Sequence, residues 1–355
     1  MFQKKELCSK CIINKNYTIK QAISAIDIGG LKIAIVLDEN SKLIGTICDG
    51  DIRRGLLKGL NLDSKVLEIT QTDCIKSSKQ LSFREASLLM NNNAILQIPI
   101  LDKNDKFIGL EISDKLIPNS KLPTGKNSAL LMAGGMGKRL RPLTNNCPKP
   151  LLKIYNKPIL EIILEQCIEN GIRNFYISVC YLADKIVNYF GDGNKWGVKI
   201  TYIFEEQPLG TAGALKLIPE NLNYPLLVIN GDVLTKTNFR DVFSYHELNN
   251  GEVTICVREH VLQSPYGVVE VEGNIYKSIN EKPIFNHLVN AGIYVLNPDL
   301  IKLINEDEFI DMPTLIEKAS KKLKKIIVYP IHEYWLDIGK PELLSKAHED
   351  WEATF

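Results

Sequence analysis

Glycines and cations gather in residues 130–152, LLMAGGMGKRLRPLTNNCPKPLL. An apolar run ends in three glycines and is followed by basic side chains: Gly134, Gly135, Gly137, Lys138, Arg139 and Lys149. Glycines let backbone N–H groups approach a polyphosphate without a Cβ in the way, and the cations can neutralise its charge. The segment differs from a Walker loop because no Ser or Thr follows Gly137–Lys138, and it lacks the third glycine of the dinucleotide fingerprint. It therefore predicts a polyphosphate site at the end of a buried strand.

A second apolar run, Leu226 to Ile229, ends in Asn230-Gly231-Asp232. A carboxylate at the carboxyl end of a strand can hold Mg²⁺ against phosphate oxygens. Aspartate after glycine is also common in ordinary turns. Asp232 is thus a candidate metal ligand that needs a second carboxylate beside it.

A polar loop, EEQPLGTAGA, covers residues 205–214 directly after a predicted strand. Gln207 can offer both a donor and an acceptor to the edge of a nucleobase, and Gly210 leaves room for the ring. The alternative is a plain strand-to-helix turn that Thr211 caps. The glycine-rich segment upstream favours the base-binding interpretation.

Taken in order, these segments resemble the sugar-1-phosphate nucleotidyltransferases over nearly all of residues 128–345. The resemblance implies that Arg139 and Lys149 are catalytic and that Mg²⁺ is held by Asp232 and Asp337. It implies nucleotide contacts from Gly134, Gly135, Gly137, Lys138, Gln207, Gly210 and Thr211, and sugar-phosphate contacts from Gly267, Glu281, Lys282 and Asn290. The substrates would be a nucleoside triphosphate and a sugar 1-phosphate. The attacking phosphate oxygen is already an anion, so the reaction needs positioning and electrostatics rather than a general base. All five histidines lie outside these motifs.

The elements that position these residues alternate between strand and helix. Residues 175–179, 199–204 and 225–229 are predicted buried strands. Residues 158–170 have apolar residues at helical spacing, with Pro158 near the start and Gly171 just past the end. This alternation predicts an α/β, Rossmann-like domain over 128–355, a mostly parallel sheet with helices on both faces. Ligands of such sheets bind beyond the carboxyl ends of the strands.

Residues 1–120 contain one pattern twice, a helix followed by two strands around a polar turn. The first copy has a helix near 19–26 and strands at 33–37 and 43–47; the second has 83–90, 96–101 and 107–111. The copies resemble a tandem CBS (Bateman) pair, an α+β module, with the sharpest match at GTICDGDIRR, residues 45–54. In that family an aspartate at the position of Asp51 binds the ribose of an adenine nucleotide. The alternative, that the pair is structural and binds no ligand, stays open, since Cys48 replaces the usual threonine and Asp114 is one residue out of place. Residues 121–127 are the expected linker.

Composition excludes several classes of partner. The formal net charge of +1 gives no electrostatic case for nucleic acid or an anionic membrane. The N-terminus has no apolar signal core, and no stretch approaches a membrane span, so we expect a cytoplasmic protein. A homo-oligomer is expected from the family resemblance.

Substrate choice follows from resemblance alone. The Pro-Leu-Gly-Thr-Ala-Gly loop at 208–213 is most similar to mannose-1-phosphate guanylyltransferases, which favours GTP. A CBS pair ahead of the catalytic domain resembles the glucosamine-1-phosphate guanylyltransferases of bacterial legionaminic acid biosynthesis, which favours glucosamine 1-phosphate. The alternatives are mannose 1-phosphate with GTP, or a uridylyl- or thymidylyltransferase of glucose 1-phosphate. A protein of another class, a CBS nucleotide sensor with an inactive transferase domain, is also considered.

Overall fold

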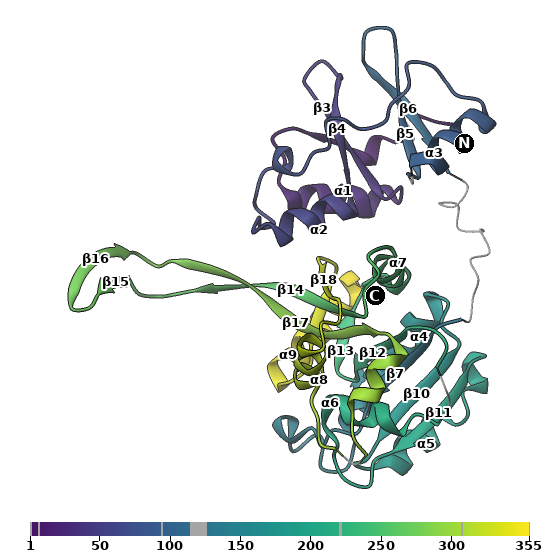
Figure 1. The fold of residues 1–355 in the computed structure, drawn as a ribbon, viewed down its shortest axis with the longest axis vertical. Helices are drawn as coiled ribbons and strands as arrows, with labels where there is room; N and C mark the ends of the chain where they lie inside the picture. The colour runs from purple at the N-terminus through teal and green to yellow at the C-terminus, as the bar shows by residue number, and fades with distance from the viewer. Residues whose placement is uncertain are drawn as a thin grey trace. The chain divides into compact units, whose positions relative to one another are not determined.

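The computed structural model describes residues 2–5, 8–93, 95–113, 126–219, 222–306 and 308–354. Its contacts divide the chain into two compact units, Met1–Leu122 and Pro123–Phe355 (Figure 1). Asp114 and residues 121–125 of the expected linker lie outside the described residues. Within the described ranges, the helices are all too short or too polar to cross a membrane.

The first unit contains the predicted repeat as two small sheets. One has the order β2-β3-β4 and the other β1-β6-β5. The strands are β1 (Phe2–Lys4), β2 (Ile12–Asn14), β3 (Ile33–Leu37), β4 (Leu43–Cys48), β5 (Gln97–Leu101) and β6 (Phe107–Ile112). The helices are α1 (Ile19–Gly29), α2 (Asp49–Leu57) and α3 (Phe83–Asn93). The predicted strands of both copies are confirmed to within about one residue at each end.

The two copies bury a shared apolar face. One buried cluster takes Ile33, Ile35 and Leu37 from β3 and Phe107, Leu110 and Ile112 from β6. Neither three-stranded sheet could bury this face alone, because a single small sheet leaves one side in water. The repeat is therefore a paired structure.

The second unit is built on a seven-stranded sheet with the order β11-β10-β7-β12-β17-β14-β18. Its strands are β7 (Ser128–Met132), β10 (Asn174–Val179), β11 (Lys199–Phe204), β12 (Leu226–Asn230), β14 (Val253–Gln263), β17 (Ile284–Leu296) and β18 (Ile326–Ile331). The first four in the order are parallel, β14 and β18 are parallel, and only β17 runs against both of its neighbours. The mostly parallel sheet is confirmed.

Helices cover both faces of this sheet, as predicted. They are α4 (Ile159–Glu169), α5 (Ala183–Phe190), α6 (Gly210–Gly213), α7 (Phe239–Leu248), α8 (Met312–Lys321) and α9 (Pro341–Thr354). Successive residues of β7 point to opposite cores: Leu131 joins the cluster of α4, α5, α7 and α9, and Leu130 joins the cluster of α6 and α8. A strand that is buried on both faces has a continuous apolar sequence. The residues before the glycines therefore show no alternation of apolar and polar side chains.

Three short strand pairs complete the second unit. They are β8 (Lys153–Ile154) with β9 (Lys157–Pro158), β13 (Val233–Thr235) with β19 (Trp335–Asp337), and β15 (Val268–Glu272) with β16 (Ile275–Asn280). The last pair lies at the tip of a long two-stranded ribbon formed by β14 and β17 (Figure 1). The β13–β19 pair lies beside the cavity described next.

Candidate functional site

A cavity of about 510 Å³ lies where β7 and β12 end. Met132 and Asn230, the last residues of these parallel strands, are register partners and both line it. It is therefore at the carboxyl edge of the sheet, where α/β proteins bind ligands. The other lining residues are Gly134, Gly135, Met136, Gly137, Lys138, Arg139, Leu140, Lys149, Pro150, Glu205, Pro208, Gly210, Thr211, Gly231, Asp232 and Gly339.

The glycine turn forms one wall of the cavity. Gly137 has φ of +60°, in the left-handed region that favours glycine, and precedes a 3-10 turn over Lys138–Leu140. The hydroxyl of Thr144 donates to the carbonyl oxygen of Gly137 at 2.9 Å and holds the turn. Lys138 and Arg139 are exposed and line the cavity. The turn can thus present backbone N–H groups and two cations to an anion.

Lys149 and Asp232 form an ion pair in the same wall. Their side chains are 12% and 23% exposed, so the pair is largely shielded from water. Lys149 begins a 3-10 turn after the glycine segment, and Asp232 follows β12. A substrate phosphate could exchange with the carboxylate as the partner of Lys149.

Asp337 is not a lining residue of the cavity, but the β13–β19 pair holds it beside Asp232, which is one. Val233 is the register partner of Asp337, and the N–H of Ile338 donates to the carbonyl oxygen of Asp232 at 2.9 Å. Burial, and then the neighbouring carboxylate of Asp232, raise the pKa of Asp337. Its Oδ1 is buried and, among the described residues, has no hydrogen-bond partner.

These two carboxylates fit a divalent cation. Hard cations such as Mg²⁺ take oxygen ligands and are commonly held by one or two carboxylates with substrate oxygens. A buried carboxylate oxygen without a partner is costly unless something satisfies it, and a cation would do so. Asp232 and Asp337 therefore meet the chemical requirement of a magnesium site.

The base loop is only partly at the cavity. Pro208, Gly210 and Thr211 line it, whereas Gln207 is exposed and is not a lining residue. Thr211 is engaged within the protein: its N–H and hydroxyl donate to Asp311 Oδ1 at 2.9 and 3.2 Å. Its hydroxyl also accepts from the N–H of Met312 at 2.8 Å. Thr211 thus ties this loop to the start of α8, and its hydroxyl is not directed to a ligand.

The predicted sugar-phosphate residues are not among the described lining residues of the cavity. Gly267, Glu281 and Lys282 are on the ribbon, and a Cβ added to Gly267 would lie 2.7 Å from Oε2 of Glu281. Asn290 is at the base of the ribbon, where it donates to the Tyr294 hydroxyl at 2.6 Å. Among the described lining residues, none comes from β14 to β17.

Several cavity residues were not singled out as candidates from the sequence, among them Glu205, Asn230 and Gly339. Glu205 is buried, its pKa is raised by burial, and its Oε2 accepts from the N–H of Leu209 at 3.0 Å. Asn230 ends β12 beside Asp232. A Cβ added to Gly339 would lie 3.1 Å from Nη2 of Arg139. Gly339 could have been suspected, because it follows Asp337 closely, but the burial of Glu205 has no signal in the sequence.

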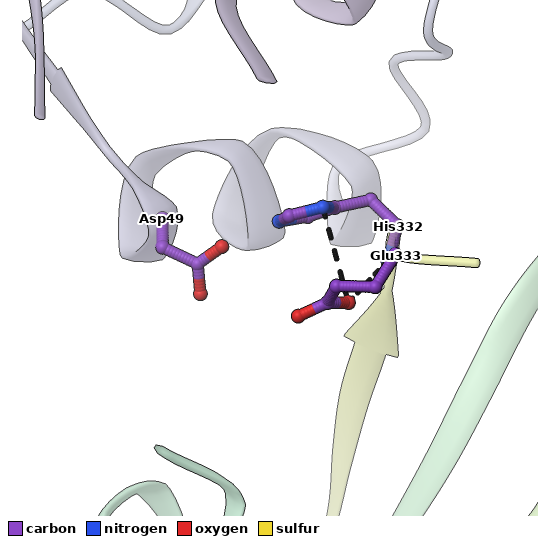
Figure 2. A group of neighbouring side chains, drawn as sticks. All are labelled: Asp49, His332 and Glu333. Carbon is purple, nitrogen blue, oxygen red and sulfur yellow. Dashed lines mark hydrogen bonds and ion pairs between the residues drawn. The ribbon is translucent and has the colours of Figure 1, made fainter. Parts of the chain in front are cut away.

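Histidine is absent from the described lining of the cavity. His246 is buried against Thr254, and burial lowers its pKa. His332 follows β18, with its Nδ1 3.8 Å from Oε2 of Glu333 (Figure 2). Figure 2 also labels Asp49, which begins α2 in the first unit and accepts a hydrogen bond from Arg53 Nε at 2.6 Å. The cavity offers cations and carboxylates rather than an imidazole base.

Comparison with known proteins agrees with this arrangement. Residues 128–354 match the model of the nucleotidyl transferase family. A mannose-1-phosphate guanyltransferase of Pichia angusta is 36% identical over 226 residues, which cover 60% of this chain and 61% of that protein. The chain thus matches less than two thirds of that relative's length.

Two solved structures resemble this chain over 63% of its length. HddC from Yersinia pseudotuberculosis has a TM-score of 0.51 and 27% identity, covering 63% of this chain and 99% of that one. A putative glucose-1-phosphate thymidylyltransferase from Bacillus anthracis has a TM-score of 0.52, 22% identity and coverage of 63% and 94%. The second of these likenesses concerns the fold alone.

Proposed function

The chain belongs to the nucleotidyl transferase family, and from this premise we propose that it condenses a nucleoside triphosphate with a sugar 1-phosphate to give a nucleotide sugar and pyrophosphate. One observation carries the proposal. Lys138, Arg139 and Lys149 meet Asp232 at a single cavity beyond the ends of β7 and β12. Cations opposite a carboxylate at a strand end suit a polyphosphate with its divalent cation.

The proposed reaction is a displacement at the α-phosphorus. An oxygen of the sugar phosphate forms the new P–O bond, the bond to the β-phosphate breaks, and pyrophosphate leaves with the electron pair. Because the nucleophile is already anionic, the residues have to bring two polyanions together and stabilise the charge that moves to the leaving group. Arg139 would face the α-phosphate and the departing pyrophosphate, and Lys149 the α-phosphate.

Asp232 and Asp337 would hold Mg²⁺. When bound, it would neutralise phosphate charge and orient the triphosphate. The pairing of β13 with β19 holds the two carboxylates in place before any substrate arrives. Lys149, paired with Asp232, is positioned at the same point.

We propose GTP as the nucleotide and glucosamine 1-phosphate as the sugar. The guanyltransferase named among the relatives, and the loop at 208–213, support GTP. Glucosamine 1-phosphate, and a place in legionaminic acid or surface-glycan synthesis, are supported by the unit ahead of the transferase domain. Mannose 1-phosphate is the second candidate, because the relatives carry that name.

A matrix of nucleoside triphosphates against sugar 1-phosphates, with Mg²⁺ and a pyrophosphate-release assay, tests the proposal. We expect the highest kcat/KM with GTP and glucosamine 1-phosphate. A clear preference for mannose 1-phosphate, UTP or dTTP would correct the specificity and keep the reaction. No turnover with any pair would reject the transferase and favour a nucleotide sensor.

We propose that the first unit is a CBS pair in which Asp51 is structural. Asp51 is only 4% exposed. Its Oδ2 accepts from the N–H of Cys48 at 2.8 Å, and its Oδ1 accepts from Arg54 at 2.5 Å and Gln71 at 3.0 Å. A ribose would have to displace these bonds. We therefore expect AMP and ATP to leave the Tm unchanged; a shift in the wild type that is lost in Asp51→Ala would establish a nucleotide site instead.

A further inference from the structure

The segment at the start of α8, residues 308–312, is bonded to the base loop. The N–H of Ile310 donates to the carbonyl oxygen of Leu209 at 2.9 Å. The carbonyl oxygen of Ile310 accepts in turn from the N–H groups of Ala212 at 2.9 Å and Gly213 at 3.2 Å. These backbone bonds join two parts of the chain that are distant in the sequence, so the position of the loop depends on this segment.

Two glycines of the base loop face the same segment. A Cβ added to Gly210 would lie 2.6 Å from the carbonyl oxygen of Ile310 and 2.9 Å from Oδ1 of Asp311. A Cβ added to Gly213 would lie 2.8 Å from the carbonyl oxygen of Glu308. Cβ atoms essentially never come within 3.0 Å of another atom, so both positions require glycine. The space that Gly210 leaves on this side is therefore filled by the segment and not by a ligand.

The carboxylate of Asp311 bonds to the loop instead of capping its own helix. Asp311 is the N-cap residue of α8, where an aspartate ordinarily accepts from an N–H of the first helical turn. In the described structure it makes no such bond. Its Oδ1 accepts from the N–H and the hydroxyl of Thr211, at 2.9 and 3.2 Å. The N–H of Met312, the first residue of the helix, donates to the Thr211 hydroxyl at 2.8 Å, so the loop and the helix cap each other.

Thr211 connects this contact to the cavity. Pro208, Gly210 and Thr211 line the cavity, and Asp311 is not among its described lining residues. Asp311 therefore acts on the cavity through a residue that lines it. A loop that is already held in place loses less conformational freedom when a ligand binds, so the ligand binds more tightly.

We propose that Asp311 is a positioning residue for the nucleoside triphosphate. By accepting both bonds from Thr211, it holds the part of the base loop that lines the cavity. The proposal rests on the proposed function, because that function identifies the ligand. The displacement takes place at the α-phosphorus, where Arg139 and Lys149 are proposed to act. Asp311 therefore affects nucleotide binding and leaves the chemical step unchanged.

Three full-length variants test this role. Asp311→Ala removes the acceptor. Asp311→Asn keeps a carbonyl oxygen that can accept the same two bonds. Glu308→Ala is the matched control. The Glu308 carboxylate lies in the same segment, but it accepts from Lys318 at 2.6 Å and from the N–H of Asn305 at 3.0 Å, and both donors are outside the loop.

Pyrophosphate release gives KM and kcat for the triphosphate with the highest kcat/KM, which we expect to be GTP. Asp311→Ala should raise KM about 10-fold, the lower end of what hydrogen bonds to a charged group contribute, and keep kcat within about 2-fold of wild type. Asp311→Asn and Glu308→Ala should keep KM within about 3-fold of wild type. An unchanged KM in Asp311→Ala, an equal rise in Glu308→Ala, or a KM in Asp311→Asn as high as in Asp311→Ala would overturn the positioning role.

Thr211→Val tests the same contact from the side of the loop. It removes the hydroxyl and keeps the N–H, so KM should rise by about 3- to 10-fold in the wild-type background. In the Asp311→Ala background the further rise should be smaller, because the acceptor of the hydroxyl is already gone. Equal effects in both backgrounds would show that the two residues act independently and would reject the proposal.

Amide hydrogen exchange gives a readout that does not depend on activity. In Asp311→Ala the N–H of Thr211 loses its acceptor, so a peptide over residues 206–214 should exchange faster than in wild type. Asp311→Asn and Glu308→Ala should exchange as wild type does. Unchanged exchange in Asp311→Ala would reject the positioning role. Faster exchange in a protein that turns over no substrate pair would reject the proposed function alone and leave Asp311 as the residue that holds the loop.

Discussion

Gly339 should control the position of Arg139. The N–H of Gly339 donates to the carbonyl oxygen of Asp337 at 2.9 Å, so the residue is held beside the carboxylate that we propose as a metal ligand. A Cβ added there would lie 3.1, 3.3 and 3.3 Å from three atoms of the Arg139 guanidinium. Ordinary contacts begin at 3.4 Å, so in Gly339→Ala the guanidinium must move.

The size of the effect follows from this overlap. Relieving it requires a shift of about 0.3 to 0.5 Å, and a misplacement of about 1 Å costs about 10²-fold in rate. If the logarithm of the rate falls in proportion to this shift, kcat should be lower by about 4- to 10-fold. Arg139 is exposed and its end is flexible, so the free energy of unfolding should change by less than about 0.5 kcal/mol.

A double-mutant cycle isolates the mechanism. Pyrophosphate release is measured for wild type, Gly339→Ala, Arg139→Ala and the double variant. If Gly339→Ala acts by displacing Arg139, it should cost nothing further when the guanidinium is already gone. An equal 4- to 10-fold loss in both backgrounds would refute the argument and place the effect on Asp337 or on the fold.

Three further predictions concern the same unit. Arg139→Ala and Asp232→Asn should each lower kcat by at least ~10²-fold and change triphosphate binding, measured by calorimetry, much less; near-normal turnover in either variant would remove that residue from the mechanism. Saturating Mg²⁺, at about 100 times its Kd, should raise the free energy of unfolding by about 2.7 kcal/mol in wild type and not in Asp337→Asn; an equal gain in the variant would place the cation elsewhere. Burial lowers the pKa of His246 below its ordinary 6.5, so the unfolded state binds more protons just below that pH. The neutral ring therefore stabilises the fold above about pH 6.5, and this contribution is lost as pH falls through the lowered pKa; His246→Gln should flatten the fall of Tm in this range, and an unchanged slope would exclude His246 as its source.

The local sequence pattern was sufficient to predict the helices and strands around the cavity. The strands at 175–179 and 199–204 and the helix after Pro158 form within about one residue of their predicted ends. Continuous apolar runs identified buried parallel strands, and proline and glycine marked the helix boundaries. Such signals are local, because each depends on side-chain periodicity within one element.

Non-local contacts account for what the patterns missed. The burial of Glu205 depends on segments far away in the chain. So does the hydrogen bond that the Thr211 hydroxyl donates to Asp311. The spacing of residue types along the sequence does not predict such contacts. The base-binding expectation for Gln207 therefore stays a prediction, and the structure leaves that side chain exposed outside the cavity lining.

The sequence alone determined which kind of chemistry to expect: glycines, cations and an aspartate at the ends of apolar runs predicted a phosphate site at the carboxyl edge of a parallel sheet, and the structure places these residues at one cavity there. Only the tertiary structure decided which of these residues meet. The β13–β19 pair brings Asp337 to Asp232, and the pairing of β14 with β17 forms the ribbon that holds Glu281, which is not among the described lining residues of the cavity. The physical reason is that residue type sets what a side chain can bind, whereas strand pairing between distant segments sets where it is held.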